Sequence, residues 1–208
     1  MSGIGQLHQW VIIGSLPDDV LLKIFKSFVD VTEIHGFASD EWRTLVHECR
    51  RWRYLVFTSP RHLNLHLLCR PPMRSVKEKL DFWPELPIYI HAIGYRWQVG
   101  EERGDFLAAL RLNHRVSGIH IENTSDSTWE TFAQLIQQPF PVLTHLWLWL
   151  CYPIMNPISR SFLAESAPCL QFLHLDSISF PALPNLLMST TDLVRLSYND
   201  IPSSGYIL

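Results

Sequence analysis

Few side chains in this sequence have a type and spacing that could support catalysis or bind a metal. His62 and His66 are four residues apart, the spacing at which two imidazoles on one helix can share a metal ion. The segment between them, HLNLH, alternates apolar and polar residues, which predicts a strand, and no third ligand is evident nearby. The sequence therefore predicts no metal site.

The spacing of the cysteines and the absence of common catalytic motifs also argue against an enzyme. Cys49, Cys69, Cys151 and Cys169 are far apart and form no C-x-x-C pair, so neither a zinc module nor a dense disulfide framework is predicted. The sequence contains no G-x-S-x-G, P-loop, G-x-G-x-x-G or H-E-x-x-H motif. We expect a protein without catalytic residues and without a cofactor.

Composition and charge limit the class of protein and its partners. The chain has 208 residues, of which 47% are hydrophobic and 18% are charged, as expected for one or two globular domains. A formal net charge of -3 gives no overall attraction to nucleic acid or to an anionic membrane. The sequence shows neither a signal peptide nor a membrane-spanning stretch, so we expect a cytoplasmic or nuclear location, or both.

The first element that could position a binding surface is a helix beginning in LPDDVLLKIF, residues 16–25. Pro17 suits the first helical position, and Asp18 and Asp19 place negative charge at the positive end of the helix dipole. Its apolar residues cover an arc of roughly 200°, about twice the stripe that an ordinary surface helix buries. A second helical pattern, Glu41–Phe57, carries a similar surplus. Either the rest of the chain or another protein must cover these surfaces.

Together these features resemble the F-box, a small helical module that binds the Skp adaptor of cullin-based ubiquitin ligases. The resemblance rests on the Leu-Pro opening, on LLKIF within the first helix and on CRRWR, residues 49–53, late in the second. It implies an F-box over residues 15–68, after an N-terminal tail of residues 1–14. The adaptor-binding residues that the resemblance implies are Leu16, Pro17, Val20, Leu21, Ile24, Phe25, Cys49 and Trp52.

After this module the apolar pattern changes from helical to alternating. Leu63, Leu65 and Leu67 alternate with polar residues, as do Ile88 and Ile90, which predicts short strands. Residues 69–87 contain four prolines and a small charged run, which indicates a connector.

An apolar triplet recurs through the remaining chain. The segments VSGIHI, LTHLWL, LQFLHL and LVRLSY all fit L-x-x-L-x-L and begin at Val116, Leu143, Leu170 and Leu193, with a period typical of leucine-rich repeats. STWETFAQLIQQ has a capping-box pattern and one apolar face, and SRSFLAESAP and LPNLLMSTTD resemble shorter helical turns.

These repeats predict the architecture of residues 88–208. One strand and its return helix cannot bury their own apolar side, so the units must stack into an irregular, curved solenoid with a parallel sheet on its concave face. The predicted fold class is therefore α+β to α/β, a small helical F-box followed by this solenoid. No polar capping unit follows the last triplet, so we expect the repeats to be incomplete at the C-terminus.

Side chains alternate across a strand, so residues between the triplet leucines should face the concave surface, beginning at His120 and Glu122. The residues that this places as a target-binding surface are His145, Trp147, Trp149, Phe172, His174, Asp176 and Arg195. Two neighbouring exposed tryptophans would be typical of a binding hot spot. In the alternative interpretation, Trp147 and Trp149 are covered by the connector or by further C-terminal sequence.

The order of F-box, connector and irregular leucine-rich repeats resembles the F-box/leucine-rich-repeat class found in fungi. The resemblance implies a substrate-recognition adaptor of an SCF-type E3 ubiquitin ligase in the Ubl conjugation pathway. Its expected partners are the Skp adaptor, through it a cullin-RING ligase, and an unidentified target protein, with no nucleic acid and no membrane. The alternative is a protein-interaction scaffold that acts outside ubiquitin transfer.

Overall fold

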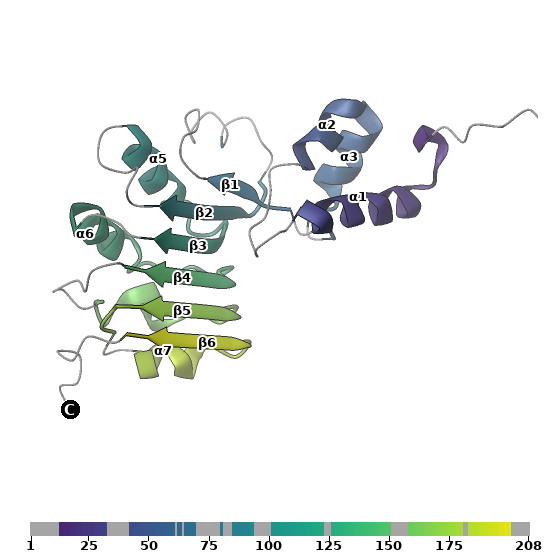
Figure 1. Ribbon diagram of the computed structural model, residues 1–208. Helices are drawn as coiled ribbons and strands as arrows, with labels where there is room; N and C mark the ends of the chain where they lie inside the picture. Colours follow the sequence, from purple (N-terminus) through teal and green to yellow (C-terminus); the bar gives the residue numbers. More distant parts are fainter. Residues whose placement is uncertain are drawn as a thin grey trace, which may run out of the picture. The chain divides into compact units, whose positions relative to one another are not determined.

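The chain divides into two compact units, residues 1–65 and residues 66–208, in the computed structural model (Figure 1). The boundary lies inside the predicted F-box of residues 15–68. Most of the predicted N-terminal tail and connector lies outside the described residues. The structure describes residues 13–32, 42–60, 62–63, 65–69, 80, 85–93, 101–122, 126–150, 158–180 and 183–200.

The first unit begins with a 3-10 turn, η1 (Ile13–Ser15), followed by the helix α1 (Asp18–Thr32). As predicted, the helix starts next to Pro17, whose carbonyl accepts hydrogen bonds from the N–H groups of Val20 and Leu21. Asp18 and Asp19 fill the first turn, where a negative charge stabilises the exposed N–H groups of a helix.

The second helical pattern folds as two helices, α2 (Arg43–Glu48) and α3 (Arg50–Thr58), not as one. Cys49 separates them because its backbone is extended, with φ -156° and ψ 166°. The Arg53 Nε atom donates a hydrogen bond of 2.9 Å to the Val46 carbonyl near the end of α2, a group that the interrupted helix would leave unsatisfied. Periodicity alone did not predict this break, because the apolar spacing continues across it.

Two apolar stripes run along α1 and have different environments. The residues of one stripe, spaced four apart, are buried: Leu21, Phe25 and Val29. The adjacent stripe, here called the α1 stripe, consists of Val20, Ile24 and Phe28. Ile24 and Phe28 are each 40% exposed, and Val20 is half-buried. The described chain thus covers only part of the apolar arc.

The predicted strand through Leu63 and Leu65 is wrong. His62 and Leu63 lie in a turn, where the Leu63 N–H donates to the Ser59 carbonyl, and the strand β1 covers only Leu67–Cys69. Leu63 and Leu65 are nevertheless fully buried. The alternation of leucines therefore predicted correctly that these side chains are buried, but predicted the backbone conformation incorrectly.

The second unit is a mixed α/β structure built on a six-stranded parallel sheet. The strands follow one another across the sheet in chain order (Figure 1). They are β1, β2 (Ile88–Ile93), β3 (Val116–Glu122), β4 (His145–Trp149), β5 (Phe172–Asp176) and β6 (Arg195–Asn199). The predicted parallel sheet is confirmed.

The register of the sheet matches the alignment of the apolar triplets. The middle triplet residue of β3, Ile119, pairs with Leu146, which pairs with Leu173, which pairs with Leu196. The last triplet residues pair in the same way: Ile121, Leu148, Leu175 and Tyr198. One repeat of sequence therefore corresponds to one step across the sheet.

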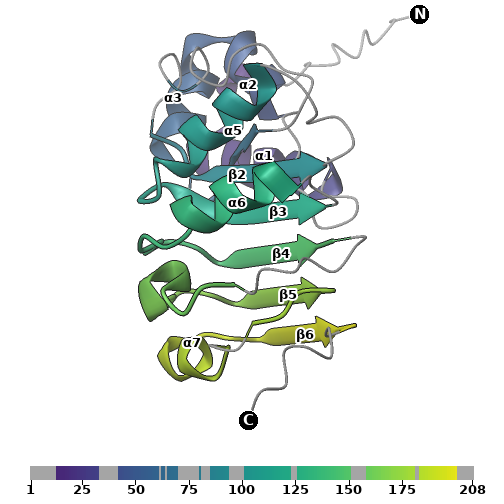
Figure 2. The same ribbon diagram turned by 90° about the vertical axis from the view of Figure 1, so that its left-hand side faces the viewer.

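Return elements between the strands lie on one face of the sheet (Figure 2). They are α5 (Glu101–Leu110), α6 (Asp126–Leu135), the 3-10 turn η4 (Phe162–Glu165) and α7 (Leu183–Ser189). Their apolar side chains, such as Phe106 and Phe132, form one core with the triplet residues of the strands. The sequence predicted α6 and its apolar face but did not predict α5, which has no comparable amphipathic pattern.

Gly118 is required by the close approach of an aromatic ring. A Cβ atom at this position of β3 would overlap the ring of Tyr89 on the neighbouring strand, and the side chain of Tyr89 is buried. We expect Gly118→Ala to lower the free energy of unfolding by about 1–3 kcal/mol, the usual cost of overpacking. Urea titration would measure it. The same substitution in a Tyr89→Leu background should cost clearly less, and an equal cost in both backgrounds would contradict this explanation.

Candidate protein-binding surfaces

The structure separates the predicted adaptor-binding residues by exposure. Three side chains are exposed: Pro17, Ile24 and Cys49. Three are half-buried: Leu16, Val20 and Trp52. The remaining two, Leu21 and Phe25, are 0% exposed, so they do not form part of the accessible surface and can only support the residues that do. Trp52 links the half-buried residues to the buried ones, because its ring packs edge to face on Phe25 with centroids 4.9 Å apart.

Arg51 of α3 fixes the start of α1. Its Nη2 atom donates a 2.6 Å hydrogen bond to the Leu16 carbonyl, and its Nε atom donates a 3.1 Å bond to Asp18 Oδ1. The Arg51 and Asp18 side chains are 38% and 59% exposed, so this ion pair contributes little to stability. Its main consequence is geometric, because it holds the Leu-Pro opening against the helix that carries Trp52.

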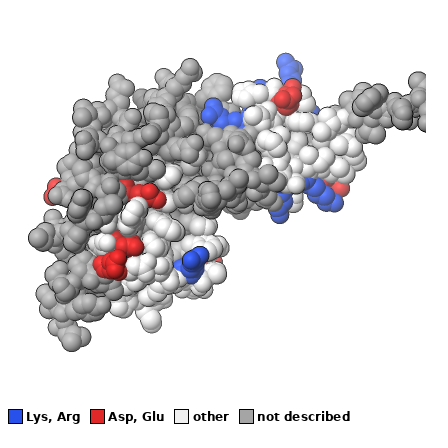
Figure 3. Space-filling view, in the orientation of Figure 1, with Lys and Arg blue, Asp and Glu red and all other residues white. Residues whose placement is uncertain are grey.

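The α1 stripe itself carries no charge, whereas Asp18, Asp19, Lys23 and Lys26 lie elsewhere on the same helix. In Figure 3 the described part of this unit that faces the viewer is mostly white, with Lys and Arg side chains, and also Asp or Glu side chains, at its edge. A partner of the α1 stripe would therefore be bound mainly through apolar contact and less through ion pairs.

The second candidate surface is the open sheet face, defined here as the face opposite the return helices. Its central row is a continuous series of rings from four neighbouring strands: His91, His120, Trp147 and His174. The centroid distances along the row are 4.6, 5.2 and 3.9 Å, and the last two pairs are stacked. The register of the strands places these residues directly opposite one another, which is why the rings meet.

Two further rows flank the ring series. In one, Tyr89 lies 6.4 Å from His145 across Gly118, and His145 stacks on Phe172 at 4.5 Å. In the other, Glu122 is the register partner of Trp149, which pairs with Asp176. The open sheet face is thus aromatic in the middle and carries carboxylates along one side.

The predicted target-binding residues all lie on the open sheet face. Trp147 and Trp149 are 42% and 39% exposed, so the described chain does not cover them. Arg195 is exposed, and the other four are half-buried: His145, Phe172, His174 and Asp176. His120, which was expected to begin an exposed surface, is only 2% exposed, because neighbouring rings pack on both sides of it.

Sequence reasoning missed the part of this surface that β2 contributes. Tyr89 and His91 stand at the same register positions as Gly118 and His120, but β2 has no complete leucine triplet to align. The alternation in IYIHAI was the available signal. It predicted a strand without giving its place in the sheet.

Burial favours the neutral form of three histidines on this face, His120, His145 and His174. It lowers the pKa of His120 to about 4, with a smaller effect from His174, and it also lowers the pKa of His145. Burial likewise lowers the pKa of His174, although Asp176 opposes the shift. The 2.6 Å contact between His120 Nε2 and Glu122 Oε1 is therefore a hydrogen bond from a neutral imidazole to a carboxylate, and not an ion pair.

His66 should make the stability of the second unit dependent on pH. Burial, together with the nearby His145, lowers the pKa of His66 from 6.5 to about 4. Between these values the unfolded chain binds the proton more tightly, so stability is full above pH 6.5 and is lost as the pH falls toward 4. At about 1.4 kcal/mol per pKa unit, we expect His66 to account for a loss of about 2 kcal/mol between pH 7 and pH 5.

Chemical denaturation of the intact chain and of His66→Gln at both pH values measures this contribution. The variant keeps a neutral side chain of similar size and should lose about 2 kcal/mol less than the intact chain over this interval. An identical loss in both proteins would contradict the assignment to His66.

Comparisons with protein families, curated proteins and solved structures gave no match for this chain. Among the described residues, no helix is both long enough and apolar enough to cross a membrane.

Proposed function

We propose that this protein is a non-catalytic substrate-recognition adaptor of an SCF-type E3 ubiquitin ligase. In this proposal the helical unit is an F-box that binds the Skp adaptor. The second unit is an irregular leucine-rich-repeat solenoid that binds a target protein through the open sheet face. The division into a helical unit and a sheet unit supports this assignment of two roles.

The observation that carries the proposal is the exposure of the α1 stripe. Ile24 and Phe28 lie on the same helix as Leu21 and Phe25, yet they are 40% exposed while the latter are 0% exposed. Two large apolar side chains in solvent, one turn apart, are the pattern by which an amphipathic helix anchors a partner. The Leu-Pro opening held by Arg51 lies at the start of the same helix.

Support for target binding comes from the two exposed tryptophans of β4. Aromatic side chains are enriched among residues that dominate binding energy, and Trp147 and Trp149 offer such area on a rigid strand. Arg195 and Asp176 add polar groups of both signs around them. A rim of this kind selects among partners, while the rings provide most of the affinity.

The proposed mechanism is geometric and requires no chemistry from this chain. The F-box fixes the chain to the ligase, and the open sheet face holds a target. Lysines of the target then remain close to the ubiquitin thioester carried by the conjugating enzyme. Holding the two reactants together raises their effective concentration, and bond formation takes place elsewhere in the complex.

Co-expression with a Skp adaptor, followed by affinity capture and size-exclusion chromatography, tests the proposal. We expect a stoichiometric complex that also recruits a cullin. A folded chain that captures no adaptor would overturn the F-box assignment. Capture of the adaptor without recruitment of a cullin would instead place the protein outside ubiquitin transfer.

A further inference from the structure

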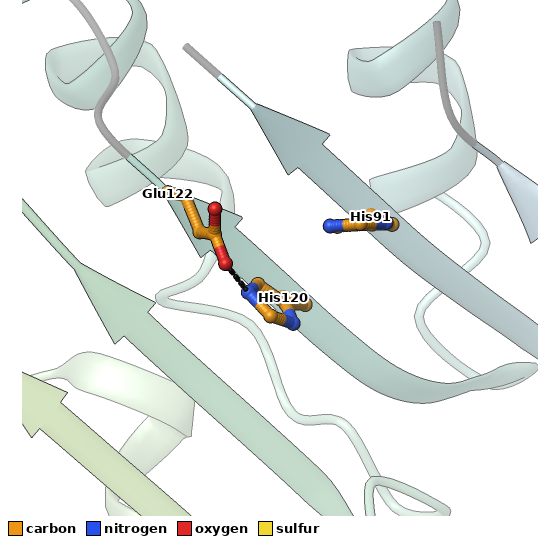
Figure 4. Close-up of side chains that lie close together, drawn as sticks. All are labelled: His91, His120 and Glu122. Atoms are coloured by element: carbon orange, nitrogen blue, oxygen red, sulfur yellow. Dashed lines mark hydrogen bonds and ion pairs between the residues drawn. The ribbon is translucent and has the colours of Figure 1, made fainter. Parts of the chain in front are cut away.

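Three side chains with metal-binding groups converge on the open sheet face: His91, His120 and Glu122 (Figure 4). One donor atom of each lies within 4.8 Å of the other two. His91 and His120 are register partners on neighbouring strands, with ring centroids 4.6 Å apart. Glu122 follows His120 by two residues and therefore projects from the same face, where its Oε1 atom lies 2.6 Å from His120 Nε2.

We propose that His91, His120 and Glu122 bind one divalent transition-metal ion, with Zn²⁺ as the preferred ion. Two imidazoles and one carboxylate are a ligand set for zinc and its first-row neighbours, whereas Ca²⁺ and Mg²⁺ prefer oxygen ligands throughout. With bonds of about 2.0–2.1 Å, the donors of a tetrahedral zinc lie roughly 3.3 Å apart. Small side-chain rotations would bring the three donors to that separation.

The surroundings hold the ligands in place. His91 and His120 are 8% and 2% exposed, and His120 is packed against the ring of Trp147 at 5.2 Å. The Glu122 side chain is 26% exposed, so an ion can enter from its side. Three protein ligands leave one position of a four-coordinate zinc for water or for a side chain of a bound protein. The site would then place a metal ion beside the aromatic centre of the open sheet face.

Metal binding by the purified intact chain tests this inference without reference to a ligase. After treatment with a chelator, the chain should bind one equivalent of Zn²⁺ by calorimetry, and Co²⁺ should give the visible absorption of a tetrahedral site. Loss of an outer-shell partner already weakens metal binding about 10- to 100-fold. We therefore expect His91→Ala and Glu122→Gln to weaken it at least ~100-fold.

Two variants, Glu122→Gln and His114→Ala, serve to interpret the result. Glu122→Gln preserves the shape of a partly exposed side chain, so this variant reports on metal binding even if His91→Ala fails to fold. His114→Ala removes an exposed histidine from the turn before β3 and should bind zinc like the intact chain. Zinc should also raise the melting temperature of the intact chain but not that of Glu122→Gln. Absence of binding, or binding that survives in Glu122→Gln through cysteines or other histidines, would overturn the proposal.

Discussion

Replacing Ile24 by Asp should abolish capture of a Skp adaptor while leaving the chain folded. Ile24 is 40% exposed in the middle of the α1 stripe, so an aspartate there remains hydrated in the free protein. We expect a loss of less than about 1 kcal/mol in folding stability. In the complex the same carboxylate would be buried against an apolar partner without a counter-charge, which costs several kcal/mol. Affinity should fall at least ~100-fold, and calorimetry with purified adaptor would measure it.

Tyr54→Asp is the matched control for this experiment. Tyr54 is a larger apolar side chain, 68% exposed, on α3, and it lies two residues from Trp52, which puts the two on different sides of that helix. The same charge at Tyr54 should leave adaptor affinity within about threefold of the intact chain, as for a surface position outside an interface. Equal losses for both variants would mean that the α1 stripe is not the binding surface. Circular dichroism should show both variants with the helical content of the intact chain.

The order and register of strands β3 to β6 were predictable from the sequence because the apolar triplets are periodic. Each triplet places an apolar residue at a fixed register position, and the sheet pairs Ile119, Leu146 and Leu173 as the alignment predicts. Burial of these residues against the return helices is the largest energetic term in the unit, so the sequence must preserve it in every repeat. Local features without such a constraint were less predictable. Nothing in the spacing distinguished the turn at Leu63 from a strand, or one helix from two around Cys49.

The candidate surfaces were predictable only in part, for a related reason. Alternation along β4 correctly placed Trp147 and Trp149 on the open sheet face, because the two faces of a strand are set by local geometry. The approach of His91 to His120 and Glu122 depends on which strand lies beside β3, and β2 has no full triplet from which its register could be read. Exposure was also unpredictable on α1. Leu21 and Ile24 are equally apolar in sequence, and only tertiary packing buries the first and leaves the second in solvent.

Trp147 and Leu148 are adjacent on β4, and substitution by alanine should lower folding stability less at Trp147 than at Leu148. Leu148 is 0% exposed beneath the return helices, so Leu148→Ala should cost about 2–5 kcal/mol of stability, as for other large-to-small core changes. Trp147 is 42% exposed, and its ring stacks on the rings of His120 and His174. Its loss should cost about 1–3 kcal/mol of folding stability, from two ring contacts of about 0.5–1.5 kcal/mol each. Thermal unfolding would measure both.

Target binding should depend on the Trp147 side chain itself and not on the stability of the core. If the open sheet face holds the target, Trp147→Ala should reduce target capture at least ~10-fold, the loss of a central aromatic anchor, while adaptor capture is unchanged. Quantitative mass spectrometry of proteins captured by the tagged chain, normalised to the adaptor, would measure this loss. Met188→Ala is the matched control, because Met188 is 89% exposed on α7, on the opposite side of the sheet. Proteins retained by Trp147→Ala, or lost equally with Met188→Ala, would place the target-binding surface elsewhere, because neither result can arise if the ring series is the anchor.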